Sequence, residues 1–244
     1  MKKILEAKNL NMSYKNNQKI ILKDVNLKFE EGDYVAIMGE SGSGKSTLLA
    51  CLAGILKPES GEVIWQDKDL YKLNDLQLSK LHRNTISYVP QSNVFLKEYS
   101  ILENLLFPYM ETGEIEEKHE KRASELLEAL KIKEMRDRFP YELSGGELKR
   151  ASIARALIMN PEVIVFDEPT TGLDNKTGEI ILSFLSYYAL KGNLVIIASH
   201  DQKVMNYSNR VYTFARENGG ISSLIAGQIK AKSNQRLEKV ITND

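Results

Sequence analysis

The 244-residue chain has only one cysteine and no apolar run long enough to span a bilayer. A single cysteine excludes an internal disulfide, and Cys51, within an apolar helical pattern, is expected to be a small core residue rather than a nucleophile. Residues 1–6 include an acid where a signal peptide would carry its uninterrupted apolar core. We therefore expect a protein that stays in the cytosol.

The chain also lacks an excess of charge of either sign, since 33 basic residues balance 33 acidic ones. General nucleic-acid-binding proteins carry a strong basic field, so no nucleic-acid partner is expected. The proportions of hydrophobic and charged residues, 42% and 27%, are ordinary for a globular protein that buries a large core.

The most informative stretch that is present is a glycine-rich loop between a predicted buried strand (34–38) and a predicted helix (48–53). It reads Gly39-Glu40-Ser41-Gly42-Ser43-Gly44-Lys45-Ser46-Thr47. Glycines allow consecutive backbone N–H groups to converge on phosphate oxygens, and the helix dipole adds positive potential. Lys45 supplies a full charge, and the Ser46 hydroxyl suits Mg²⁺. A surface turn can match these few fixed positions, but the strand–loop–helix context favours an ATP or GTP site with Mg²⁺.

Apolar patterning predicts an α/β fold with a mostly parallel core sheet, an N-terminal antiparallel β subdomain and a helical subdomain. The runs 163–166 and 194–198 are continuously apolar, which is typical of parallel strands buried on both faces. Residues 4–30 alternate around a polar turn at 15–18, as in an antiparallel hairpin. Short strands are expected at 63–65 and 85–89.

The middle of the chain, about residues 92–143, is predicted to be the helical subdomain. Ser100 and Glu103 have the spacing of a capping box that opens a helix, which Pro108 is expected to end. A second, highly charged helix is predicted over 114–133. Residues 1–217 would then form one nucleotide-binding domain, followed by a tail (218–244) to which the sequence assigns no role.

Two carboxylates, Asp167 and Glu168, follow the predicted strand 163–166, at the carboxyl edge where open parallel sheets bind ligands. Asp167 suits Mg²⁺, directly or through water. Glu168 suits a general base that polarises the water attacking the γ-phosphate. The alternative is that both residues only cap the following turn at Pro169.

A second glycine-rich helix start reads Leu143-Ser144-Gly145-Gly146-Glu147. Ser144 and Glu147 have capping-box spacing, and alone this is a well-made helix N-terminus. Beside one nucleotide site, a second anion-binding helix start favours either a second anion or the nucleotide of another molecule.

These motifs, taken together and in this order, resemble the ATPases of ATP-binding cassette (ABC) transporters from about residue 5 to about residue 214. The set comprises the phosphate loop, Gln91, the Leu143–Glu147 run, the strand ending in Asp167-Glu168, Thr171-Gly172-Leu173-Asp174 and Ile197-Ala198-Ser199-His200-Asp201. The resemblance implies that the chain is an ATPase with ATP and Mg²⁺ as its ligands.

The resemblance also implies residue roles. Tyr14 matches the aromatic that stacks on adenine, although a tyrosine at a strand end can equally be a packing residue. Gln91 matches the glutamine that reaches Mg²⁺ and the attacking water and links the helical lobe to the core. Ser144, Gly145, Gly146 and Glu147 match the signature that binds the partner subunit's ATP, and Asp174 matches a residue that contacts the opposite subunit.

His200 matches the histidine that touches the γ-phosphate near Glu168. Because it follows a buried strand, topology alone also puts it on the same sheet edge as Asp167. The two other histidines, His82 and His119, lie in polar settings and are expected to be solvated.

The partners implied by the resemblance are a second copy of the chain, in a head-to-tail dimer that sandwiches two ATP molecules, and an integral membrane permease. This would place the protein on the cytoplasmic face of a bacterial membrane. Residues 81–86, 95–96 and 103–108 resemble the branch that serves lipoprotein release, macrolide export and resistance to antimicrobial peptides.

The helical lobe after Gln91 is also more apolar and aromatic than a solvated lobe requires. Roughly half or more of these residues are expected to pack internally, and the remainder would form an exposed groove for a short cytoplasmic helix of the permease. The residues are Val94, Phe95, Leu96, Tyr99, Leu105, Leu106, Phe107 and Tyr109.

Two other functions remain open to the sequence. A soluble ABC ATPase acting on nucleic acid or ribosomes usually has two cassettes or a long coiled coil, and neither is present. A GTPase would need an Asn-Lys-x-Asp sequence, which the chain lacks. One departure from the family pattern is Leu148-Lys149, where relatives commonly carry glutamines, so polar contacts behind the signature are expected to differ.

Overall fold

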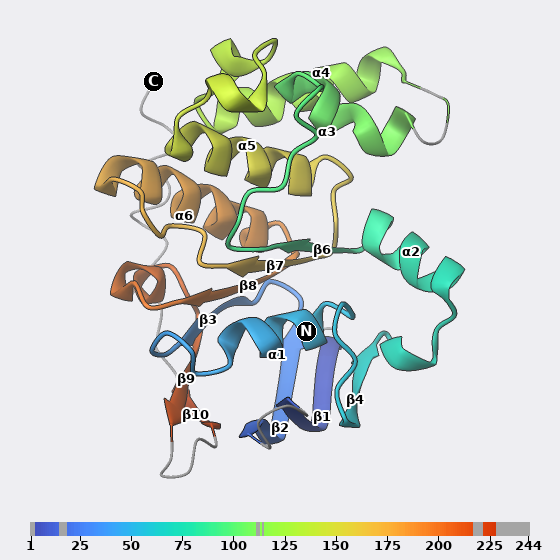
Figure 1. The fold of residues 1–244 in the computed structure, drawn as a ribbon, viewed down its shortest axis with the longest axis vertical. Coiled ribbons are helices and arrows are strands. Elements are labelled where there is room, and N and C mark those ends of the chain that lie inside the picture. The colour runs from blue at the N-terminus through green and yellow to red at the C-terminus, as the bar shows by residue number, and fades with distance from the viewer. Residues whose placement is uncertain (1–2, 15–18, 111–112, 114, 217–221, 228–244) are drawn as a thin grey trace.

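The computed structural model describes residues 3–14, 19–110, 113, 115–216 and 222–227. It has a central parallel sheet with helices on one face and helix α1 with a small antiparallel sheet on the other (Figure 1). The strands are β1 (Lys3–Tyr14), β2 (Lys19–Glu30), β3 (Tyr34–Met38), β4 (Ser60–Trp65), β5 (Lys68–Asp69), β6 (Ile86–Val89), β7 (Val163–Asp167), β8 (Leu194–Ser199), β9 (Arg210–Arg216) and β10 (Ser222–Gly227). The α-helices are α1 (Lys45–Leu52), α2 (Asp75–Asn84), α3 (Ile101–Met110), α4 (Glu117–Ala129), α5 (Gly145–Leu157) and α6 (Asn175–Leu190).

The central sheet has the strand order β10-β9-β3-β8-β7-β6. Every neighbouring pair from β9 to β6 is parallel, and only β10 joins antiparallel to β9. The predicted parallel core sheet is therefore confirmed. Asp167 lies opposite Ala198 in the β7–β8 register, so the carboxyl ends of these two strands meet at one edge.

The antiparallel sheet has the order β2-β1-β4-β5. The predicted pairing within residues 4–30 is confirmed by β1 and β2, and the strand expected at 63–65 is the end of β4. The expected turn at 15–18 lies outside the described residues.

Each central strand contributes side chains to two hydrophobic cores, one on each face of the sheet. In β3, Tyr34, Ala36 and Met38 face the core under α5 and α6, whereas Val35 and Ile37 face the core around α1 and the antiparallel sheet. Strands β7 and β8 alternate in the same way. This two-sided burial explains the continuous apolarity of their sequences.

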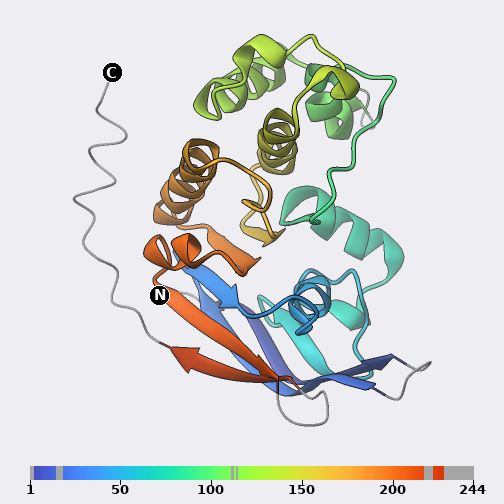
Figure 2. The same ribbon diagram turned by 60° about the vertical axis from the view of Figure 1, so that its left-hand side comes forward.

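The helical lobe consists of α3 and α4, packed on each other and on α5, which in turn contacts β6. Figure 2 shows this lobe at one end of the molecule and the antiparallel sheet at the other. The capping box at Ser100 is confirmed, since Glu103 Oε2 accepts from the Ser100 N–H (2.7 Å) and the Ser100 Oγ accepts from the Glu103 N–H (3.3 Å).

Two helix ends differ from expectation. Helix α3 does not stop at Pro108 but continues to Met110. Pro108 removes only one hydrogen bond in the last turn, while buried Leu105 and Leu106 hold the helix in the core. Helix α4 is shorter than 114–133, and Lys131, just beyond it, has a left-handed φ of 55°. Within the described part of the chain, no helix has the length and apolarity to cross a membrane.

Candidate nucleotide-binding site

The phosphate loop occupies the connection between β3 and α1, as predicted. Gly44 precedes the helix with φ of 102°, and a Cβ there would lie 2.8 Å from Ile21 Cγ2. A Cβ on Gly39 would lie 2.9 Å from the Cβ of Phe214. Both positions therefore need glycine. Gly44 needs it because of its left-handed backbone and the nearby Ile21 side chain, and Gly39 needs it because Phe214 approaches closely.

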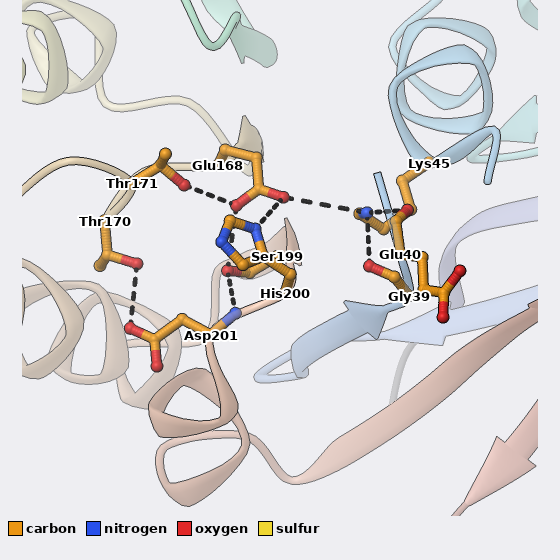
Figure 3. A network of polar contacts seen from close by, with 9 residues as sticks. All are labelled: Gly39, Glu40, Lys45, Glu168, Thr170, Thr171, Ser199, His200 and Asp201. Carbon is orange, nitrogen blue, oxygen red and sulfur yellow. Dashed lines mark hydrogen bonds and ion pairs between the residues drawn. The ribbon is translucent and has the colours of Figure 1, made fainter. Parts of the chain in front are cut away.

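Lys45 opens α1 and folds its side chain back over this loop. Its Nζ donates to the carbonyl oxygens of Gly39 (2.7 Å) and Glu40 (2.9 Å) and lies 3.8 Å from Glu168 Oε1 (Figure 3). The side chain is buried. A buried ammonium bound mainly by neutral carbonyls retains attraction for a more highly charged anion such as a phosphate.

Glu168 is the centre of the polar network in Figure 3. Its Oε1 lies 3.0 Å from His200 Nδ1, and its Oε2 accepts from the Oγ atoms of Thr171 (2.8 Å) and Ser199 (3.3 Å). Its backbone N–H donates to the Ala198 carbonyl with a left-handed φ of 50° at Glu168. Non-glycine residues rarely adopt this conformation, and they do so mostly where a side chain has to be aimed.

The two adjacent carboxylates have opposite electrostatic environments. Burial raises the pKa of Asp167, and the charge of Glu168 adds to the effect against the opposing contributions of Ser46, Lys45 and Lys149. Burial also acts upward on Glu168, but hydrogen bonds from His200 and Thr171, with the charges of His200 and Lys45, leave its pKa lowered. Neighbouring acids whose pKa values are driven apart are typical of sites that assign them different roles.

The surroundings of Asp167 fit a divalent cation. The Ser46 side chain opposes the rise in the pKa of this carboxyl group, while Oδ1 is buried and accepts no hydrogen bond from the described residues. A hydroxyl and a carboxylate are hard oxygen ligands, and Mg²⁺ uses few protein ligands beside water and phosphate. The donor set therefore suits Mg²⁺ bound together with a nucleotide.

The second helix start has the predicted cap. Glu147 Oε2 accepts from the Ser144 N–H (2.8 Å) and hydroxyl (2.7 Å), and the Ser144 Oγ accepts from the Glu147 N–H (3.4 Å). Ser144 and Gly145 are exposed at the first turn of α5. Asp174, also exposed, caps α6 through the N–H and hydroxyl of Thr177. These contacts are local, so Ser144, Gly145 and Asp174 remain at the surface.

The structure brings Lys45, Ser46, Asp167, Glu168 and His200 into one site. Of the other predicted site residues, Glu40, Ser41 and Gly42 are exposed on the loop, and Ser43 and Thr47 are buried. Gln91 is exposed, and its carbonyl accepts a hydrogen bond from Lys149 Nζ (3.2 Å). Tyr14 ends β1, and its side chain lies outside the described part of the structure.

Sequence reasoning missed three contributors to the site, namely Thr171, Ser199 and Lys149. The hydroxyls of Thr171 and Ser199 hold Glu168, and the sheet register that places Ser199 beside it could have suggested this contact. Lys149 was singled out only as a departure from the family pattern, and no signal in the sequence showed that it is buried.

The comparisons with known proteins agree with this geometry. A family model described as "ABC transporter" matches residues 22–171, more than half of the chain. The chain belongs to the ABC transporter family. It is an ATP-binding subunit of that family and an ATPase.

The relatives of this ABC ATPase include three informative proteins. The ABC transporter ATP-binding protein MJ0796 of Methanocaldococcus jannaschii is 39% identical over 215 residues, covering 85% of this chain and 92% of the relative. The lipoprotein-releasing system ATP-binding protein LolD of Saccharophagus degradans is 37% identical, covering 79% and 85%. The macrolide export ATP-binding/permease protein MacB of Campylobacter jejuni is 37% identical over 78% of this chain, which spans 30% of MacB.

The solved structures extend the agreement to the fold. A dimeric, post-hydrolysis structure of MJ0796 bound to ADP and Pi has a TM-score of 0.84 to this ABC ATPase, covers 93% of this chain and 99% of its own, and is 34% identical. The predicted P-loop ABC ATPase fold is confirmed, and the names LolD and MacB match the branch expected from the sequence.

Proposed function

We propose that this ABC ATPase hydrolyses Mg²⁺-ATP in a head-to-tail homodimer and thereby drives a membrane permease in export, extraction or resistance to peptide antibiotics. The observation that carries the proposal is the set of contacts that aims Glu168 beside Lys45 and Asp167 at the end of β7. All four contributors, Lys45, Asp167, Glu168 and His200, converge where a triphosphate at the phosphate loop would end.

The chemistry follows from the charges of this site. Lys45 and the N–H groups of the loop would bind the phosphates, and Ser46, Asp167 and Gln91 would hold Mg²⁺. Mg²⁺, when bound, neutralises charge that develops on the phosphate oxygens. Glu168, kept ionised by its hydrogen-bond donors, would accept a proton from the attacking water. His200, on the solvent side of Glu168, would donate to the γ-phosphate.

The start of α5, which carries the signature residues 144–147, supports a site that a second subunit completes. A Cβ on Gly145 would meet no atom within 4 Å, and Gly145 has no left-handed φ, so the monomer itself does not require glycine there. A helix start whose first residues, Ser144 and Gly145, are exposed suits an anion presented by another molecule. Ser144, Gly145, Gly146 and Glu147 would thus bind the ATP held by the partner's phosphate loop, with Asp174 at the same interface and Tyr14 against adenine. The dimeric MJ0796 structure is a precedent for association of such cassettes.

A hollow of about 330 Å³ between α2, β6, α3 and α5 supports a docking site for the permease. Exposed Val94 and Leu96 line it together with Phe107. Other apolar residues of the lobe pack internally, as expected for about half of them. Leu105 and Leu106 are buried in the core, and Phe95 lies half-buried beneath the Arg155 guanidinium.

The charge of this hollow specifies its occupant. Its lining includes two residues with guanidinium groups, Arg83 and Arg155, and none of the lining residues is acidic. The occupant would be a short cytoplasmic helix of the permease with an apolar face and at least one carboxylate. Docking here would hold the ATPase on the cytoplasmic face of the membrane.

The proposal is tested by the dependence of activity on association. The specific ATPase rate of the purified protein should rise with its concentration in the dilute range, because each site needs two subunits. Lys45→Ala should bind ATP poorly at every concentration. A rate per subunit that is constant on dilution, with normal ATP binding, would contradict the composite site. Copurification with RNA instead of a membrane protein would favour the soluble alternative.

A further inference from the structure

The second turn of α5 contains a buried lysine that the proposed function does not use. Lys149 is only 4% exposed, and its Nζ donates to the carbonyl oxygens of Gln91 (3.2 Å) and Pro90 (3.5 Å). Both acceptors belong to the segment that leaves β6 for the helical lobe. The side chain thus joins the helix that begins with Ser144 to the segment that carries Gln91.

Lys149 interacts electrostatically with the carboxylates of Asp167 and Glu168. Burial lowers the pKa of Lys149, and the charges of Asp167 and Glu168 act in the opposite direction. The same cation opposes the rise in the pKa of Asp167 that burial causes. Lys149 therefore interacts both with the backbone at Gln91 and with the electrostatics of the site to which Gln91 is assigned.

A purely structural role does not explain a lysine at this position. Burying an ammonium group costs more free energy than burying an apolar side chain of similar length, and two neutral carbonyls only partly compensate for the lost water. A methionine would fill similar space without that cost. The buried charge is thus better explained by a need to fix the two carbonyls and to interact with the carboxylates.

We propose that Lys149 is a positioning residue that fixes the Pro90-Gln91 backbone to α5, so that the Gln91 side chain is aimed at the Mg²⁺ site and moves together with the signature helix. This inference rests on the role proposed for Gln91. Lys149 does not touch substrate or metal, and its effect on hydrolysis is exerted through Gln91.

The test compares Lys149→Met with Lys149→Arg, alone and combined with Gln91→Ala. Lys149→Met should lower kcat about tenfold, since small misplacements of positioning groups cost that much or more. The affinity for a fluorescent ATP analogue and the Tm should stay at or above the parent values. Lys149→Arg keeps the charge and the donors and should stay within about threefold of the parent kcat. In the Gln91→Ala background, Lys149→Met should cause no further loss.

Hydrogen–deuterium exchange provides a readout independent of activity. Lys149→Met should speed exchange in a peptide covering residues 88–95 and leave β7 and β8 unchanged. Lys121→Met, which changes an exposed lysine of the same lobe, is the matched control and should alter neither exchange nor kcat. If Lys149→Met lowers the Tm too far to be assayed, Lys149→Gln replaces it in the exchange measurement and in the combination with Gln91→Ala.

The outcomes separate this inference from the proposed function. If Gln91→Ala retains full activity, the role of Gln91 fails, and this inference fails with it. The other outcome is that Gln91→Ala lowers kcat as proposed. If adding Lys149→Met to it then lowers kcat again by the same factor as in the parent background, only the positioning role of Lys149 is overturned. Unchanged exchange at 88–95 together with a lowered Tm would show that Lys149 is structural.

Discussion

The Nδ1 atom of His200 lies 3.0 Å from Oε1 of Glu168, the same oxygen that lies 3.8 Å from Lys45 Nζ. One carboxylate oxygen is thus shared by a solvent-exposed imidazole and a buried ammonium. A γ-phosphate entering the site would compete with Glu168 for Lys45 and for the imidazole of His200. ATP binding would thereby free the carboxylate for the attacking water.

Replacement of Glu168 by glutamine tests its role as a base. Glu168→Gln keeps the shape of the side chain but cannot accept the proton, so we expect turnover to fall about 100-fold or more. ATP and Mg²⁺ binding should persist, since the charge that repels the γ-phosphate is removed. Size-exclusion chromatography should then show an ATP-bound dimer. Parent-like hydrolysis by this variant would refute the assignment.

Asp167→Asn is expected to stabilise the protein without nucleotide while abolishing activity. The raised pKa of Asp167 means that its ionised form is less favourable in the folded than in the unfolded state, so at neutral pH the carboxylate lowers the free energy of unfolding. The variant should gain about 1 kcal/mol at pH 7.5.

The pH dependence of the stability difference between the parent and Asp167→Asn provides the control for this prediction. The difference in free energy of unfolding should shrink as the pH falls through the raised pKa of the folded state and should vanish below the ordinary aspartate value of 3.8, where the carboxyl is neutral in both states. Mg²⁺-ATP should raise the Tm of the parent more than that of Asp167→Asn. A variant that is less stable at pH 7.5 would show that Asp167 is already satisfied by the protein.

The Gly145→Ala variant tests whether glycine at this position is required by the monomer or by a partner subunit. Because the new Cβ would meet nothing within 4 Å, the Tm should be unchanged or slightly higher. ATP binding by the monomer should also be unchanged, whereas hydrolysis should fall about tenfold or more if a partner's phosphates approach this backbone. Gly178→Ala is the matched control, since its Cβ would make only ordinary contacts, 3.8 Å from Thr170 Cγ2. Equal rates for both variants would place the interface elsewhere.

Val94→Asp tests the permease groove. Val94 is 58% exposed, so the substitution should leave folding and basal ATPase activity near normal. It would put a like charge where an acidic helix is expected and should therefore abolish cosedimentation with membranes containing the permease. Leu190→Asp changes a side chain of similar exposure, 55%, at the end of α6 and should cosediment normally. Loss of membrane association in both variants, or in neither, would contradict this location.

The sequence predicted the core sheet and the phosphate loop well because both depend on local patterns. Apolar runs identify β7 and β8, and four spaced positions identify the loop. The aim of Glu168 could not be predicted in the same way, because it depends on a left-handed backbone and on hydroxyls from two separate segments. The sequence also could not tell which apolar residues of the lobe pack internally, because Val94 and Leu105 are equally apolar in sequence and only packing decides which one is exposed.

The sharing of β3, β7 and β8 between two hydrophobic cores has a consequence for how the chain melts. Each of these strands places alternate side chains in both cores, so losing the packing on one side removes half of the support for the strands that form the other. The nucleotide-binding core should accordingly melt in a single transition despite its two-sided architecture. Helices α3 and α4 contribute buried side chains to only one of the cores, and partial opening at equilibrium should begin there.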